Sequence, residues 1–269
     1  MRGTTVTNGG ESMKFKETSY IIAQERIASD VYSMWIRTEK IAKAALPGQF
    51  ISVYSNDSSR LLPRPISICE VDREQKALRI VYRVVGKGTA EFSKMKAAET
   101  LEILGPLGNG FPIERCKKGK KPLLIAGGIG IPPMVWLARE LQGEIQIAAG
   151  YRDEIFLEKE LETNGRLYIA TEDGSHGTKG NVLDAVEDHH LEADVMFACG
   201  PAPMLRALKK YALEKNIECW LSLEERMACG VGACLACVCK TKEVDPHSNV
   251  HNKRICEDGP VFLSTEVEL

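Results

Sequence analysis

Residues 121–142 read KPLLIAGGIGIPPMVWLARELQ, and this stretch decides the fold of the second half of the chain. It opens with a compact apolar run, typical of a buried strand. Gly127, Gly128 and Gly130 then mark a tight turn, and IPPMVWLARELQ predicts a helix with proline at its start, where a missing N–H does no harm. Glycines there let the backbone approach a pyrophosphate. A plain strand-to-helix turn is the alternative, because Pro133 stands where the G-x-G-x-x-G fingerprint has its third glycine.

The alternation of strands and helices continues to about residue 222. EIQIAAGYR, RLYIATED and DVMFACG read as strands, and EIFLEKELE and PAPMLRALKKYALEKN as helices. The pattern predicts a doubly wound α/β domain with a parallel sheet over residues 117–222. Both the first turn and Cys199-Gly200-Pro201 would lie at the carboxyl edge of that sheet, where ligands bind. Cys199 is a candidate catalytic residue on the wall of the site, and a buried core thiol is the alternative.

Residues 14–116 have a different pattern of short runs rich in β-branched residues. YIIAQERIA, VYSMWIRTE, QFISVYS, PISICEV, ALRIVYRVV and ETLEILGPL are separated by turn signals such as PGQ and NDSS. Six such runs predict a six-stranded antiparallel β-barrel. EFSKMKA, at residues 91–97, predicts one short helix between strands.

The barrel region carries one candidate binding motif, RPIS at residues 64–67. Arg64 can neutralise phosphate charge, and Ser67 can form a hydrogen bond with the edge of a heterocycle. Gly86, Gly88 and Thr89 precede the predicted helix, whose first N–H groups can take a pyrophosphate. Alone, an Arg-Pro turn is more often an ordinary loop.

A cysteine-rich segment ends the chain, in ERMACGVGACLACVCK at residues 225–240 and RICEDGPVF at residues 254–262. Its C-x4-C-x2-C spacing, followed by a fourth cysteine, is typical of plant-type [2Fe–2S] ligation. Zinc sites more often use two C-x2-C pairs, and the odd count of nine cysteines without a secretory leader argues against disulfides. Cys239 falls outside the spacing and is expected to be a small buried hydrophobe. The candidate ligands are Cys229, Cys234, Cys237 and Cys256.

Composition excludes several classes of partner. The 269 residues carry a net charge of −2 and are 44% hydrophobic, which is ordinary for a globular protein and disfavours nucleic-acid binding. No apolar run is long enough to span a bilayer. The leader over residues 1–13 has no hydrophobic region of the signal-peptide type, so we expect it to be disordered and the protein to be cytoplasmic.

The order of motifs RPIS, GKGT, LGPLGNGF, GGIGIPP and FACGPAPM resembles that of the ferredoxin–NADP reductase superfamily over residues 14–220. The cysteine segment, residues 223–269, narrows the resemblance to the electron-transfer subunits of the NAD-linked class B dihydroorotate dehydrogenases. The interval between Cys237 and Cys256 looks longer than the usual hairpin of that family. The resemblance implies FAD contacts at Arg64, Pro65, Ile66, Ser67, Val81, Tyr82, Arg83, Gly88 and Thr89. It implies a nicotinamide nucleotide on Gly127, Gly128, Gly130, Gly200 and Pro201, and the [2Fe–2S] cluster on the four cysteines.

The function that this resemblance implies is electron transfer in pyrimidine (UMP) biosynthesis. Electrons would pass from dihydroorotate to FMN on a catalytic partner subunit, then through the cluster and FAD to NAD+. The implied assembly is a 2+2 heterotetramer. Asp153, Glu154 and Glu158 make the segment after the second strand acidic, which favours NAD over NADP. A reductase subunit of a hydrogenase or transhydrogenase and a zinc-stabilised binding module are the alternatives.

Overall fold

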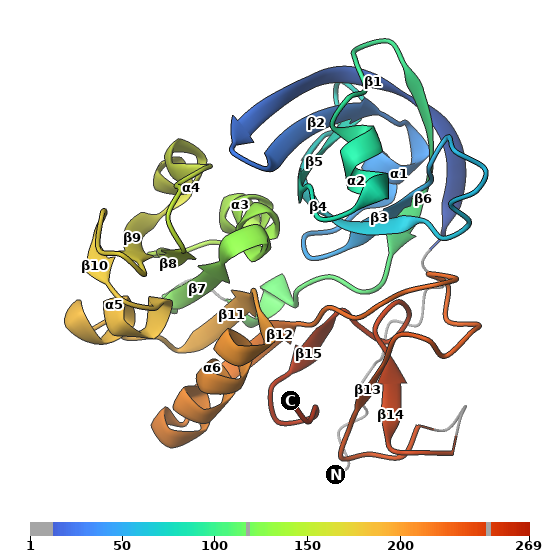
Figure 1. Ribbon diagram of the computed structural model, residues 1–269. Coiled ribbons are helices and arrows are strands. Elements are labelled where there is room, and N and C mark those ends of the chain that lie inside the picture. The colour runs from blue at the N-terminus through green and yellow to red at the C-terminus, as the bar shows by residue number, and fades with distance from the viewer. Residues whose placement is uncertain (1–12, 117–118, 246–248) are drawn as a thin grey trace.

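The computed structural model describes residues 13–116, 119–245 and 249–269, so the leader predicted to be disordered lies, apart from Met13, outside the described residues. The described chain forms a closed six-stranded barrel, a seven-stranded sheet and a two-stranded hairpin (Figure 1). None of its helices combines the length and the apolar character that crossing a membrane requires. The predicted architecture of barrel, doubly wound domain and C-terminal cysteine segment is confirmed.

The barrel is antiparallel throughout, in the order β1-β2-β5-β4-β3-β6. Buried and exposed side chains alternate along part of β1, whereas β3 and nearly all of β5 are buried, and the inward side chains fill one apolar cluster. A short helix, α1 (Lys40–Ala44), joins β2 to β3. The strands are β1 (Phe15–Ala28), β2 (Val31–Arg37), β3 (Phe50–Val53), β4 (Arg64–Asp72), β5 (Ala77–Arg83) and β6 (Thr100–Leu107).

The second barrel helix, α2, spans Lys87–Phe92, so the prediction of a helix over residues 91–97 is wrong in its position. The side chain of Thr89 explains the early start. Its hydroxyl accepts a hydrogen bond from the N–H of Gly86 at 3.3 Å and donates one to the carbonyl of Gly86 at 3.2 Å. Gly88 and Thr89 therefore lie inside the first turn of the helix rather than before it.

The seven-stranded sheet has the order β10-β9-β8-β7-β11-β12-β15, and its first six strands are parallel. Helices α3 (Ile131–Glu140) and α4 (Glu158–Asn164) cover the face toward the barrel, and α5 (Val182–Asp188) and α6 (Ala202–Lys215) cover the other (Figure 1). The parallel strands are β7 (Pro122–Gly127), β8 (Gln146–Tyr151), β9 (Arg166–Thr171), β10 (Thr178–Lys179), β11 (Val195–Cys199) and β12 (Glu218–Ser222). Single 3₁₀ turns lie at Ile113–Arg115 and Gly128–Gly130.

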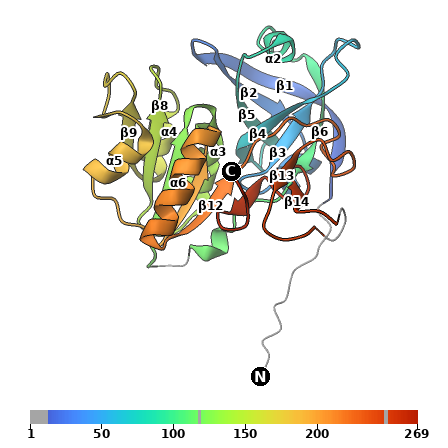
Figure 2. The ribbon, with the colours of Figure 1, turned by 60° about the horizontal axis from the view of Figure 1, so that its bottom comes forward.

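The cysteine segment contacts both the barrel and the seven-stranded sheet. Hairpin strands β13 (Val238–Lys240) and β14 (Asn252–Arg254) lie below the barrel in Figure 1 and in front of it in Figure 2, and β15 (Val261–Leu263) then pairs antiparallel with β12. A Cβ added at Gly108 in the barrel would lie 2.5 Å from the carbonyl oxygen of Gly259, so the contact is backbone against backbone. Strand β15 therefore adds the seventh strand to the sheet that contains β12.

Candidate functional site

The barrel and the carboxyl edge of the parallel sheet enclose a cavity of about 390 Å³. Strands β4 and β5 and the start of α2 form its barrel wall. Every predicted flavin contact except Gly88 lines that wall: Arg64, Pro65, Ile66, Ser67, Val81, Tyr82, Arg83 and Thr89. The opposite wall consists of Ile129, Ser222, Leu223, Glu224, Glu225, Met227 and Pro260.

Gly88 supports the cavity from behind. A Cβ at this position would lie 2.5 Å from Nε of Arg64, so glycine lets the guanidinium rest directly against α2. Arg64 also donates a hydrogen bond to the carbonyl of Leu62, which orients its side chain. The positive charge of Arg64 is thus held at one end of the cavity, beside the backbone of α2.

Two titratable side chains of the cavity have shifted pKa values. Burial raises the pKa of Tyr82, whose hydroxyl donates to Oε1 of Gln24 at 2.9 Å. Glu224 is exposed to solvent but lines the cavity, and partial desolvation there also raises the pKa of its carboxyl. Glu224 has no hydrogen-bond or ion-pair partner among the described residues. A carboxyl group in this setting holds its proton to a higher pH than an exposed one.

The two glycine turns of the sheet pack against each other. A Cβ on Gly130 would lie 2.3 Å from the carbonyl oxygen of Cys199, and a Cβ on Gly200 would lie 3.1 Å from the backbone nitrogen of Gly127. These glycines therefore serve the contact between β7 and β11. Gly128 differs, because its φ is +53° and a Cβ there would meet nothing within 4 Å. It leaves open backbone at the carboxyl edge, as a phosphate approach requires.

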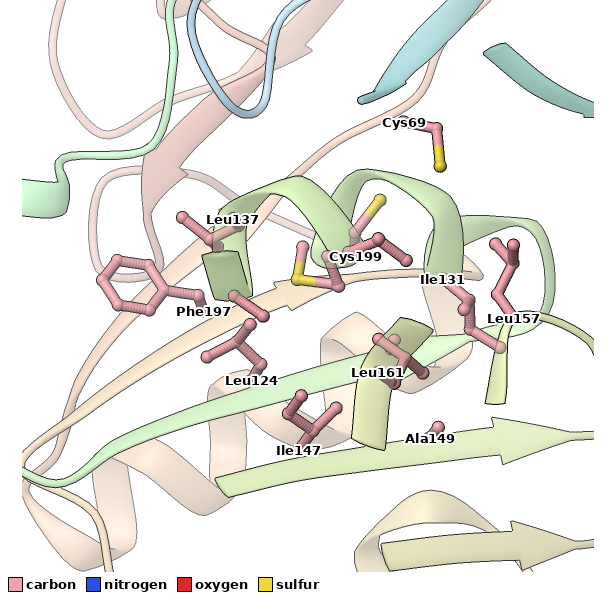
Figure 3. Close-up of a cluster of buried hydrophobic side chains, with 14 of the residues drawn as sticks. Cys69, Leu124, Ile131, Leu137, Ile147, Ala149, Leu157, Leu161, Phe197 and Cys199 are labelled. Atoms are coloured by element: carbon pink, nitrogen blue, oxygen red, sulfur yellow. The ribbon is translucent and has the colours of Figure 1, made fainter. Parts of the chain in front are cut away.

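Cys199 lies behind these turns rather than on the cavity wall. Figure 3 shows it between α3 and the sheet with Leu124 and Phe197, and it is 1% exposed. Burial raises the pKa of its thiol to about 12, opposed by a hydrogen bond with Ser222. The thiol is therefore neutral near pH 7.

A second hollow, of about 470 Å³, lies beyond the carboxyl end of β8. The acidic stretch that favoured NAD forms most of it, with Asp153, Glu154, Glu158 and Glu160 among its lining residues. The backbone N–H of Ser29 donates to Glu154 at 2.7 Å, and this bond lowers the pKa of the Glu154 carboxyl. The hollow therefore presents carboxylates beyond the carboxyl end of β8.

The four candidate cluster cysteines form two pairs. The side chains of Cys229 and Cys234 are hydrogen-bonded, and so are those of Cys237 and Cys256. Among the described residues, no three His, Cys, Asp or Glu side chains gather closely enough to hold one metal ion. Two thiol pairs suit a two-iron cluster, in which each iron takes two protein ligands, better than a tetrahedral zinc site.

Backbone N–H groups surround these sulfurs. Gly232 donates to Sγ of Cys256 at 3.1 Å, and Cys256 donates to Sγ of Cys237 at 3.4 Å. Hydrogen bonds from Cys256 lower the pKa of Cys237 to about 6. The side-chain hydrogen bond with Cys237, together with burial, raises the pKa of Cys256. For Cys229, burial is outweighed by hydrogen bonds from Val231 and the Cys234 thiol, and its pKa falls to about 7. The loop thus favours the thiolate, the form that ligates metal, at Cys229 and Cys237.

The path of the loop depends on two glycines, and its outer face is apolar. Gly230 and Gly232 have φ of +71° and +82°, a conformation that side chains rarely adopt. Cys234 is exposed between Val231 and Leu235, which are 38% and 43% exposed. The outermost thiol is therefore framed by apolar side chains at the surface.

Sequence reasoning missed the second wall of the cavity. The segment from Ser222 to Met227 and Pro260 carry no recognisable binding motif, and they reach the cavity only because β12 and β15 pair. The one available signal was proximity along the chain, since Met227 stands two residues before Cys229.

The barrel, the doubly wound sheet and the cavity between them define an oxidoreductase with the ferredoxin–NADP reductase fold. A ferredoxin NADP+ reductase from Neisseria gonorrhoeae shares this fold at 16% identity, with a TM-score of 0.60 over 74% of this chain and 91% of that one. The structure of an NADH-dependent reduced ferredoxin–NADP oxidoreductase matches at 30% identity and a TM-score of 0.82, over 97% of this chain and 91% of that one. That match includes the cysteine segment.

The family follows from the relatives. Residues 224–268 match the model for the iron–sulfur cluster binding domain of dihydroorotate dehydrogenase B. The electron transfer subunit of dihydroorotate dehydrogenase B (NAD(+)) from Geobacillus sp. (strain WCH70) is 41% identical over 96% of this chain and all of its own length. The corresponding subunit from Bacillus caldolyticus is 42% identical over 94% of this chain and 99% of its own. The chain belongs to this family of electron transfer subunits, as its motifs predicted.

Proposed function

We propose that this chain is the electron-transfer subunit of an NAD-linked dihydroorotate dehydrogenase, carrying electrons between a [2Fe–2S] cluster, FAD and NAD. One observation carries the proposal. Met227 lines the cavity between barrel and sheet, and Cys229, two residues further, belongs to the first thiol pair. The site suited to a flavin and the site suited to a cluster are thus adjacent. The names of the relatives support the same function.

The cavity fits FAD by its size and chemistry. Its volume lies within the range of about 300–1,000 Å³ typical of cofactor sites. Arg64, held against Gly88, supplies positive charge for a pyrophosphate, and Ser67 offers a hydroxyl to a ring edge. We assign FAD binding to residues 14–116, with contacts from the nine residues named above, and NAD binding to residues 117–222.

The cysteine pairs fit a [2Fe–2S] cluster, and we assign residues 223–269 to it. Bound flavin exchanges two electrons with a nicotinamide and single electrons with a cluster, so it links the two kinds of carrier. The residues of this chain bind the cofactors and orient them. Gly128 opens the backbone toward the nucleotide, Gly200 and Pro201 shape the neighbouring turn, and Cys199 supports that turn from behind.

A partner subunit completes the activity. The cavity walls described above hold no acid–base pair suited to dihydroorotate, which supports an FMN-containing catalytic subunit as the electron donor in pyrimidine biosynthesis. The apolar rim formed by Val231 and Leu235 around Cys234 supports docking at the cluster. We propose a 2+2 heterotetramer with electron flow from dihydroorotate through FMN, the cluster and FAD to NAD+. All nine cysteines are free thiols, which fits the reducing cytoplasm.

The test is reduction of the anaerobically purified protein by its partner. The visible spectrum should show flavin peaks above broad iron–sulfur absorption, and the flavin should bleach when the FMN subunit and dihydroorotate are added. A colourless protein containing zinc would instead support the binding-module alternative. A coloured protein that this partner cannot reduce would exclude the dihydroorotate assignment.

A second candidate function is a reductase subunit in another electron-transfer complex. The match to the NADH-dependent ferredoxin–NADP oxidoreductase over 97% of this chain favours it. Identity of 41% to the dihydroorotate subunits against 30% to that protein favours the first proposal. Co-purification with an FMN protein that oxidises dihydroorotate, rather than with a second reductase chain, distinguishes the two.

A further inference from the structure

Arg79, on barrel strand β5, is a buried cation in a network that joins the barrel to the nucleotide-binding sheet. It is 7% exposed. Its Nε donates to Oγ of Ser33 at 2.9 Å, and its Nη1 donates to Oε1 of Glu160 on α4 at 3.1 Å. Glu70 lies 3.7 Å from the same nitrogen and also pairs with Arg139 on α3 at 2.6 Å. Two cations, Arg79 and Arg139, thus meet the carboxylates of Glu70 and Glu160 between the units, and Glu140 lies 3.9 Å from Nε of Arg139.

The partner of Arg79 belongs to the nucleotide-binding hollow. Glu160 is one of the carboxylates that line the acidic hollow beyond β8. Glu154, from the same lining, accepts the N–H of Ser29 in the turn between β1 and β2. The wall of the hollow is therefore attached to the barrel at two points, and each attachment uses a lining carboxylate.

The same strand reaches the flavin cavity. Val81, Tyr82 and Arg83 follow Arg79 on β5 and line the cavity, and two residues of strand cover about 7 Å. Trp136, from α3, is 0% exposed and packs within the barrel's apolar cluster, so the units are also joined by a shared core. One strand therefore contacts both cofactor sites.

We propose that Arg79 is a positioning residue for the nicotinamide nucleotide, holding the acidic hollow at a set separation from the flavin cavity. The proposal rests on the function proposed above. Hydride transfer requires reacting atoms about 3–3.5 Å apart, and a misplacement of about 1 Å can cost about 100-fold in rate. Arg79 fixes Glu160 and with it the hollow that would take the adenosine end of the nucleotide. The nicotinamide end can then meet the flavin without one unit having to close onto the other.

The test is Arg79→Met in the flavin- and cluster-loaded protein, with Arg139→Met as its matched control. Arg139 belongs to the same network but contacts Glu70 and the carbonyl of Val71, not the hollow. For Arg79→Met we expect the Kd for NAD+ to rise about tenfold, and flavin reduction at saturating NADH to slow by a similar factor. The long-wavelength absorption of reduced nicotinamide stacked on oxidised flavin should weaken. Flavin content should stay unchanged, and Arg139→Met should stay within about twofold in each measurement.

Hydrogen exchange gives a readout independent of turnover. In the wild-type protein, α4 should be protected with or without NAD+, whereas in Arg79→Met it should become protected only when NAD+ is added. Glu160→Gln removes the ion pair while Arg79 keeps Glu70 and Ser33, so it serves if Arg79→Met does not fold. Wild-type values in both variants, or equal losses in Arg139→Met, would overturn the inference. A wild-type protein that binds no NAD+ or flavin would instead overturn the proposed function.

Discussion

Met227 and Cys229 occupy two different sites although only one residue separates them. The side chain of Met227 lines the cavity between barrel and sheet, and the thiol of Cys229 is paired with that of Cys234 in the cluster loop. On the other side, Pro260 lines the cavity and Cys256 belongs to the second thiol pair. The segment that carries the four cysteines therefore meets the cavity wall at both of its ends. Changes at the cavity and changes at the cysteines can be measured separately.

The cluster ligands are tested by removing one of them. Cys229→Ser should lose most of the iron and the broad visible absorption, because one iron would lack a thiolate ligand. FAD content should remain close to one per chain, since the barrel wall is unchanged. Cys239→Ser is the control: Cys239 lies outside both pairs, and burial raises the pKa of its thiol to about 11. Equal loss of iron in the two variants would contradict the ligand assignment.

The position of Arg64 is tested by adding one methyl group. Gly88→Ala places a Cβ within 2.5 Å of Nε of Arg64, and the flexible guanidinium can move away. We therefore expect little loss of thermal stability but a rise of about tenfold in the Kd for FAD, the scale of one charge-assisted hydrogen bond. Quenching of flavin fluorescence measures it. Gly86→Ala is the matched control, because a Cβ there meets nothing within 4 Å. Equal effects at both glycines would exclude the contact with Arg64 as the cause.

The Glu224 carboxyl should make stability depend on pH. Its raised pKa means that the folded protein binds this proton more tightly than the unfolded chain. Its contribution is fully present below the unfolded pKa of about 4.3 and is lost as pH rises through the folded pKa. Glu224→Gln should therefore unfold at higher urea than wild type at pH 7, and this advantage should vanish near pH 4. An equal dependence in Glu225→Gln would point to general charge repulsion instead.

Cys199 should influence stability rather than proton transfer. Cys199→Ala should lower the free energy of unfolding by about 1 kcal/mol, since it leaves a small void in a packed cluster. The pH profile of flavin reduction by NADH should keep its shape, because a thiol with a pKa of about 12 does not titrate near neutral pH. Loss of a titration step from that profile would instead assign Cys199 a direct chemical role.

The strands and glycine turns were predictable because their signals are local. Apolar runs bounded by Gly, Pro and Asn predict strands wherever they occur, and C-x4-C-x2-C restricts its own loop. The starts of two helices were harder to predict. The hydroxyl of Thr89 moved the start of α2, and Leu157, at φ +59°, delays α4 to Glu158 although the apolar pattern begins earlier.

Contacts between segments that lie far apart in the chain could not be predicted from the sequence. The sequence did not indicate that Gly130 and Gly200 also make room for neighbouring parts of the chain. The pairing of Arg79 with Glu160 joins residues 81 positions apart, and two opposite charges among 72 charged side chains give no sign of being partners. The second cavity wall likewise depends on β15 returning to β12.

The pairing of β15 with β12 has a consequence for the synthesis of the chain itself. Strand β12 keeps an open edge until Val261–Leu263 has been synthesised and has paired with it. An open parallel edge invites pairing with another chain. The same segment carries Cys256, so the last of the four candidate cluster ligands and the strand that covers this edge are delivered together. Loss of the segment from Cys256 to Leu263 should therefore expose this sheet edge to aggregation, so an intact cysteine segment also protects the parallel sheet.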